Sequence, residues 1–375
     1  MSTTPARTAR AHPAVRTDDV LACTFEQLDV RDGLIDGVAA VCKTWSSAWR
    51  RRCLGSYRMA ALGIGPFDYA EYVSACPMAG VLLADYGNAR LVEVLSYGRV
   101  QTELCQNISG PDGLACCADG TAWVIARDSS CIVHVALEPN NTITEWPHSL
   151  GEEQGRYFQS IEFDFLPVDI QIAGECVLVL IDDENELGRV DVFDAQTTAK
   201  LYSFGQAQEG GYGEELRAPK CMAVHGDYCF IADTYNQCVK IFDWRERVLV
   251  RTIGKQAPAP PYTDFTNEPP WNPDNYEDAR QGSAPGEFIE PWGIAFRDGK
   301  LYVSELGGRR IQILKVGGDM LNGTVECLQI IPSPDGRRLT GICLDKSGQL
   351  WFTARQFELG DQGFPTCLHV LAPFV

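Results

Sequence analysis

The chain lacks several features that would place it in common classes of protein. No stretch approaches the roughly 18 consecutive apolar residues that span a bilayer. Met1 to Arg16 contains no apolar run of the secretory kind, and the 15 cysteines include no Cys-x-x-Cys pair. Scattered cysteines without an export signal indicate a reducing compartment, so we expect a cytoplasmic or nuclear protein whose thiols pack as small apolar side chains.

Sequence motifs of enzymatic chemistry are also missing. The five histidines form no His-Glu-x-x-His motif and no cluster with zinc spacing, and there is no Gly-x-Ser-x-Gly elbow and no P-loop. His134 and His369 fall in strand patterns, where a lone histidine is usually structural. The sequence therefore predicts no catalytic residue, no metal site and no cofactor.

Charge is distributed unevenly along the chain. Residues 1–53 hold eight Lys/Arg and six Asp/Glu; because the whole chain carries −18, residues 54–375 carry −20. A domain this acidic repels phosphate backbones. The balance argues against nucleic acid and favours a protein as the partner.

One repeated phrase decides the fold class. In each copy a short apolar strand follows a proline, a glycine turn leads to a second strand, and a third and a fourth strand follow. The two clearest copies begin at Pro219 and Pro291 and end with Val248–Ile253 and Val325–Ile330. Four antiparallel strands joined in sequence are one blade of a β-propeller.

Weaker copies of the phrase begin near Gly80, Gly113, Asp169 and Gly341. Six copies suffice to close a ring, so we predict an all-β, six-bladed β-propeller over residues 55–375, monomeric, with a long loop at 255–287. Because the last copy holds three strands, we expect Tyr57–Leu62 to supply its fourth strand and to close the ring, which removes both free sheet edges.

The segment before the propeller has a helical pattern. Apolar residues recur at steps of three and four over residues 18–54, which predicts a short hairpin of two helices after a disordered tail at 1–17. A hairpin of this size has too little core to fold alone. It is expected to dock on the propeller or on a partner.

The repeats resemble NHL repeats. The matching residues are the blade-opening Pro219 and Pro291, the turns Ala84–Asn88 and Ala232–Asn236, and the entry sequence Gly286–Pro291. This resemblance implies a propeller fold over most of the chain. It says little about function, since propellers serve as enzymes, scaffolds and RNA binders alike.

The N-terminal segment resembles an F-box. The resemblance implies that a Skp-type adaptor of an SCF ubiquitin ligase binds residues 18–54, although the usual Leu-Pro opening is absent and the spacing is longer. The expected adaptor-binding residues are Leu21, Phe25, Leu28, Val41, Cys42 and Trp45. The alternative is a helical cap packed on the propeller.

Acidic and amide residues recur in the turns that follow the second strand of successive copies. Two interpretations are open: each caps its own turn through nearby backbone N–H groups, or together they form a surface for a partner. The predicted partner-binding residues are Asp85, Asn88, Asp128, Asp182, Asp183, Asp233, Asn236 and Glu305.

These features together predict a eukaryotic interaction protein and not an enzyme. The expected role is an F-box-type substrate receptor whose propeller binds a protein substrate. One alternative is a metal-dependent propeller hydrolase or lyase, in which carboxylates at the axis hold Ca²⁺ or Zn²⁺. Another is an RNA-binding NHL protein.

Overall fold

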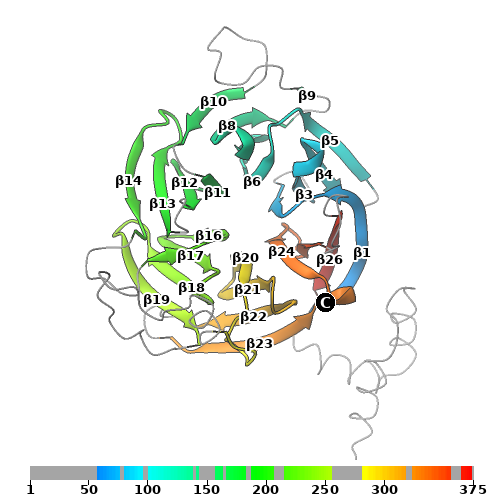
Figure 1. Cartoon of the computed structure of the whole chain (residues 1–375), viewed down its shortest axis with the longest axis vertical. Helices are drawn as coiled ribbons and strands as arrows, with labels where there is room; N and C mark the ends of the chain where they lie inside the picture. The colour runs from blue at the N-terminus through cyan, green and yellow to red at the C-terminus, as the bar shows by residue number, and fades with distance from the viewer. Residues whose placement is uncertain are drawn as a thin grey trace, which may run out of the picture.

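The computed structural model describes residues 57–76, 80–95, 100–137, 141–142, 157–163, 166–182, 187–206, 215–255, 281–317, 323–355 and 365–373. The predicted tail, the predicted F-box-like hairpin and most of the predicted loop at 255–287 lie outside these residues. The described residues form six sheets arranged as a ring around a central axis (Figure 1). The prediction of an all-β propeller with six blades is confirmed.

Each blade is an antiparallel meander that runs from the axis to the rim. The innermost strands are β2 (Tyr72–Ala75), β6 (Pro111–Cys116), β11 (Leu166–Ala173), β16 (Cys221–His225), β20 (Pro291–Arg297) and β24 (Arg338–Leu344). The second strands are β3 (Val81–Asp85), β7 (Thr121–Ala126), β12 (Cys176–Asp182), β17 (Tyr228–Asp233), β21 (Lys300–Glu305) and β25 (Leu350–Arg355). We number the blades one to six in this order.

The third and fourth strands complete the blades toward the rim. The third strands are β4 (Arg90–Leu95), β8 (Cys131–Ala136), β13 (Leu187–Asp194), β18 (Cys238–Asp243), β22 (Arg310–Val316) and β26 (Pro365–Pro373). The fourth strands are β5 (Val100–Gln106), β10 (Tyr157–Glu162), β14 (Lys200–Phe204), β19 (Val248–Gly254), β23 (Val325–Pro332) and β1 (Tyr57–Asp68). Two short strands, β9 (Asn141–Thr142) and β15 (Leu216–Arg217), add to β5 and β13.

The ring closes through strands from opposite ends of the described chain. β1 pairs antiparallel with β26, in a register that sets Tyr57 opposite Pro373 and Ile64 opposite Leu368 (Figure 1). Three irregularities interrupt this pairing along its length. The predicted closure of the last blade by the segment that begins at Tyr57 is therefore confirmed.

Apolar clusters hold neighbouring blades together, one at each of the six interfaces. Because successive side chains of a strand point to opposite faces, a single strand supplies two interfaces. In β17, Phe230 packs toward blade five, whereas Ile231 packs toward blade three. This demand on both faces explains why the second strands read as continuous apolar runs rather than as alternating patterns.

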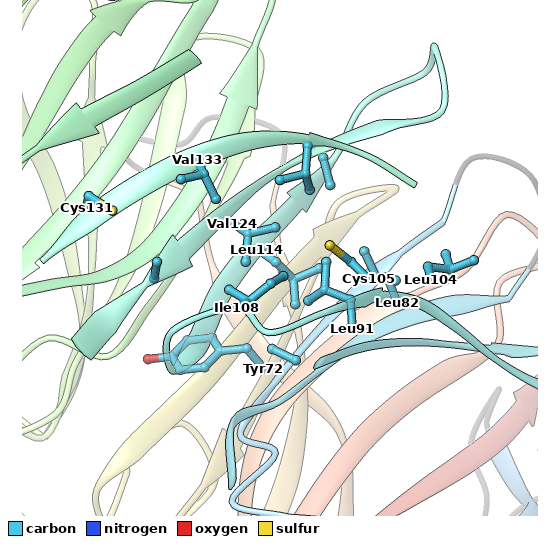
Figure 2. Close-up of a cluster of buried hydrophobic side chains, with 14 residues drawn as sticks. Tyr72, Leu82, Leu91, Leu104, Cys105, Ile108, Leu114, Val124, Cys131 and Val133 are labelled. Carbon is cyan, nitrogen blue, oxygen red and sulfur yellow. The ribbon is translucent and has the colours of Figure 1, made fainter. Parts of the chain in front are cut away.

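Inner strands of adjacent blades approach closely near the axis, and glycine permits this. A Cβ on Gly341 would lie 2.3 Å from the backbone oxygen of Glu71, and one on Gly293 would lie 2.3 Å from that of Thr340. Figure 2 shows the cluster between blades one and two, in which the Tyr72 hydroxyl points away from the apolar side chains. Tyr72 thus faces the axis, where the candidate site lies.

Candidate active site

The turn acids predicted from the sequence serve the blades themselves. Asp233 is buried; its carboxylate accepts hydrogen bonds from the backbone N–H of Arg217 (2.7 Å) and the Asn236 amide (2.8 Å), and it pairs with Lys240 Nζ at 2.8 Å. Asp85 is equally buried and accepts from the backbone N–H of Asp68. These carboxylates fasten the entry of a blade to its second strand.

Glu305 repeats this arrangement in blade five. Its carboxylate accepts from the backbone N–H of Ile289 at 2.9 Å and from Gln312 Nε2 at 2.8 Å, and it pairs with Arg310 Nε at 2.6 Å. Burial raises the pKa of Glu305, against the effect of Arg310. The side chain is fully buried, so it presents no surface to a partner.

The other predicted turn residues are more scattered. Asn88 is exposed and donates to Asp85, and the buried Asn236 donates to Asp233. Asp128 is exposed and accepts from the Tyr86 hydroxyl at 2.6 Å. Asp182 pairs with Lys220, the residue directly before the inner strand of blade four. Outside the described residues lie Asp183 and the predicted adaptor-binding Leu21, Phe25, Leu28, Val41, Cys42 and Trp45.

A cavity of about 210 Å³ occupies the axis of the ring, and all six innermost strands line it. Asp169 and Tyr72 stand at one end, and Ala75, Arg297 and Leu344 mark the other, at or near the ends of their strands. The volume lies below the roughly 300–1,000 Å³ of pockets for drug-sized ligands. The cavity therefore suits a small molecule.

Asp169 is the ionisable side chain best placed to act in this cavity. Its Oδ1 accepts the backbone N–H of Ile170 at 2.8 Å, and its Oδ2 accepts that of Met222, in blade four, at 2.7 Å. Burial raises the pKa of this carboxyl to about 7, although these hydrogen bonds act in the opposite direction. Asp169 thus holds a proton that is readily exchanged at neutral pH.

Cys221 lines the cavity beside Asp169, but it does not have the character of a nucleophile. Burial raises the pKa of its thiol well above the usual range, and the Asp169 charge adds to this effect. A thiol must ionise to attack, and neighbouring cations normally promote this. Cys221 therefore stays neutral and serves as part of the wall.

Two further buried carboxyls stand beside the axis, each paired with an arginine. Arg127 Nη1 lies 3.0 Å from Asp112 Oδ2, and Arg355 pairs with Glu71. Burial raises the pKa of Asp112 to about 7, against the Arg127 charge, while Glu71 and Asp169 raise it further. Burial likewise raises the pKa of Glu71. The three carboxyls are thus close enough to influence one another's charge.

Tyr72 lines the cavity and directly follows Glu71 in the chain. Its hydroxyl donates to the backbone oxygen of Lys220 at 2.8 Å, which links blade one to blade four on the far side of the ring. Glu71 and Lys220 immediately precede their inner strands. Burial raises the pKa of the Tyr72 hydroxyl well above its usual value, so it remains a donor.

These carboxyls do not fit a metal site. Within the described ranges, no three His, Cys, Asp or Glu side chains converge in a way that could hold a metal ion. Glu71 and Asp112 are paired with guanidinium groups, and both oxygens of Asp169 accept backbone N–H groups.

The sequence interpretation missed Glu71, Asp112 and Asp169. The signal was present: a polar or ionisable residue stands directly after, or two places after, a blade-opening proline, as in Pro111-Asp112 and Pro167-Val168-Asp169. The repeats are recognised by their apolar residues, which carry no information about the ionisable residues at these positions. Residues that interrupt a repeat next to the axis are where function is expected on a ring of blades.

Comparisons with known proteins support the fold. No protein-family model matches the chain, and no curated protein matches it, so the NHL and F-box resemblances gain no support. A gluconolactonase from Xanthomonas campestris is similar in structure: TM-score 0.54, 14% identity, covering 87% of this chain and 93% of that one. A luciferin-regenerating enzyme matches with a TM-score of 0.53 and 10% identity, covering 82% of this chain and 92% of that one. The WD40 propeller domain of Doa1 matches with a TM-score of 0.50 and 11% identity, covering 85% of this chain and 97% of that one.

The function predicted from the sequence is wrong. An F-box-type receptor of a ubiquitin ligase, without enzymatic activity, was expected, but solved structures with this fold include propeller enzymes, a lactonase among them. In the described part of the chain, no helix is long and apolar enough to cross a bilayer.

Proposed function

We propose that this chain is a propeller enzyme, a hydrolase or lyase that acts on a small molecule bound in the axial cavity. The observation that carries the proposal is Asp169, a buried carboxyl in the cavity wall whose pKa is raised to about 7. Catalytic bases have pKa values near the working pH, because the base must be ionised yet still basic enough to take a proton. Asp169 meets both requirements.

The fixed geometry of Asp169 suits this role. Two backbone N–H groups hold its oxygens, and these donors belong to adjacent inner strands, so the carboxyl cannot rotate freely. No cation pairs with it among the described residues, in contrast to Asp112 and Glu71. The ionisation of Asp169 is therefore controlled mainly by burial, and the carboxylate is basic enough to accept a proton near neutral pH.

Hydrolysis of an ester or lactone illustrates the chemistry. The Asp169 carboxylate takes a proton from a water molecule, and the water oxygen bonds to the carbonyl carbon. The carbon–oxygen bond of the ester then breaks, and protonated Asp169 returns the proton to the departing alkoxide oxygen. The carboxylate is regenerated, and the products are an acid and an alcohol, joined in one molecule if the substrate is a lactone.

A panel of small lactones and carboxylic esters tests this proposal with the purified full chain. The structural likeness to a gluconolactonase makes lactones the first class to try. We expect the rate of hydrolysis to rise with pH through about 7, as Asp169 ionises. EDTA should leave the rate unchanged, since the axial carboxyls form no metal site.

Variants separate the role of Asp169 from general effects. We expect Asp169→Asn to lower kcat/KM by about 100-fold or more while the near-ultraviolet circular dichroism is kept. Glu246→Gln changes an exposed acid in the turn between β18 and β19, outside the cavity lining, and it should have no effect. Full activity in Asp169→Asn would remove the proposal, as would a lack of turnover of every lactone and ester tested.

A further inference from the structure

Trp292 holds an unusual position at the charged end of the axis. It belongs to the inner strand of blade five and is only 9% exposed. Lys220 Nζ from blade four lies 5.7 Å from the centre of its ring, and Arg355 Cζ from blade six lies 5.6 Å from it. The indole thus lies between cations contributed by both neighbouring blades.

Two N–H donors in this group have no acceptor. Among the described residues, neither the indole Nε1 of Trp292 nor the Nε of Arg355 makes a hydrogen bond, although both atoms are buried. Buried donors are almost always paired in folded proteins, so each unpaired one requires an explanation. Here the two belong to side chains that are packed together, which points to one missing acceptor.

Similar side chains elsewhere in the ring are fully paired. Arg245 stacks over Trp244 at 4.4 Å, yet the Trp244 indole donates to the backbone oxygen of Gly226 at 2.9 Å. Trp351 donates to Asp345 Oδ2 at 2.8 Å. The unpaired indole at the axis is therefore not a general feature of tryptophan in this fold.

We infer that Trp292, Arg355 and Lys220 form a binding site for a small organic carboxylate, separate from the axial cavity, whose lining includes none of them. One carboxylate oxygen would accept the indole N–H and the other the Arg355 Nε–H, in the field of the Lys220 ammonium. Charge-assisted hydrogen bonds of this kind are strong in a site shielded from water. The long, partly exposed side chain of Lys220 would move to admit the ligand, whereas Arg355 stays in place.

Charge favours a monoanion over a dianion at this site. Arg355 pairs with Glu71, and Lys220 Nζ lies 3.1 Å from Asp182 Oδ2, so two carboxylates already stand beside the two cations. A second negative charge on the ligand would be repelled by both. The expected order of affinity is therefore acetate or propionate above sulfate or phosphate.

The test follows the indole N–H signals of the full chain, labelled with ¹⁵N, during titration with sodium acetate. The Trp292 signal is assigned by its loss in Trp292→Phe, which removes the donor and keeps an aromatic ring. We expect a saturable shift of this signal, with no shift of the Trp244 and Trp351 signals, whose donors are already bonded. Because the readout is binding, it does not depend on Asp169 or on any turnover.

Two variants complete the design. Arg355→Lys keeps the charge but removes the Nε–H, and it should weaken acetate binding about tenfold or more. Arg245→Lys makes the same change at the paired tryptophan and should leave the affinity unchanged. Equal or tighter binding of phosphate would overturn the carboxylate assignment. If the Trp292 signal does not shift at lower acetate concentrations than the Trp244 signal, the proposed site is wrong.

Discussion

Two sets of buried acids lie in the same ring, and they differ in what surrounds them. The turn acids, of which Asp233 is the best example, have a cation, an amide and a backbone donor around one carboxylate. Asp169, near the axis, has backbone donors but no cation among the described residues. The first arrangement gives the carboxylate a cation as partner, and the second does not.

This difference teaches where to look for function on a repeated scaffold. A compensated acid contributes to the fold and is expected to take no part in chemistry, because its oxygens are already engaged by other groups of the chain. Burying an acid whose pKa is raised to near 7 in a cavity wall costs stability. Acids with such shifted pKa values are concentrated at functional sites. Asp112 lies between the two sets, since it has an arginine partner and yet has a pKa raised to about 7.

Removal of a turn acid should have the largest effect on stability. Asp233→Ala leaves the Lys240 ammonium, whose side chain is only 4% exposed, without its partner. Loss of one member of a buried ion pair typically lowers the free energy of unfolding by about 3–5 kcal/mol. Urea unfolding measures this, and the double variant Asp233→Asn, Lys240→Met should recover much of the loss because no buried charge remains.

A control for this prediction lies on the surface. Glu246→Ala removes an exposed acid in the turn between β18 and β19 and should change the free energy of unfolding by less than about 0.5 kcal/mol. If Asp233→Ala were as mild as this control, the turn acids would not be fasteners of the blades, and the contrast with the axial set would lose its basis.

The axial acids Asp112 and Asp169 should instead make the free energy of unfolding depend on pH. Their pKa in the folded chain is raised to about 7, whereas an unfolded aspartate has a pKa of about 3.9. Between these values the folded state holds protons that the unfolded state has released, so the free energy of unfolding falls as the pH rises from about 4 through 7. Below this window both carboxyls are protonated in the folded and the unfolded chain, so they no longer make the free energy of unfolding depend on pH.

Urea unfolding at a series of pH values measures this slope. Asp112→Asn and Asp169→Asn should each flatten the fall, by up to about 4 kcal/mol for a shift of about three pKa units. Asp169→Asn will also place an amide against one of the backbone donors, which lowers stability at every pH and leaves the slope argument intact. Curves that run parallel to the unchanged chain would show that these acids ionise normally.

The sequence predicts the blades and the closure of the ring. The repeats beginning at Pro219 and Pro291 predict β16–β19 and β20–β23, and the missing strand of the last repeat predicts the pairing of β1 with β26. Apolar periodicity reports these features directly, because every blade must bury both faces against its neighbours.

The site follows from a different kind of information. Glu71, Asp112 and Asp169 come from three separate blades and meet only when the ring is closed. No local pattern shows that Tyr72 reaches Lys220, which is 148 residues away. The turn acids stand out in the sequence because they recur. In a repeat protein, however, a recurring residue usually stabilises the repeat itself. The axial residues vary from blade to blade, and such variation is invisible to a search for repeats.

Asp128 offers the mildest test, because it is a turn acid without burial. It accepts the Tyr86 hydroxyl at 2.6 Å, and this hydrogen bond raises the pKa of Tyr86 to about 12. In Asp128→Asn the pKa of Tyr86 should move back toward about 10, which the ¹³Cζ signal of the tyrosine would follow. The free energy of unfolding should change by less than about 0.5 kcal/mol, since the pair is exposed. A loss as large as that of Asp233→Ala would mean that position in the turn, rather than burial with a cation, decides which acids hold the ring together.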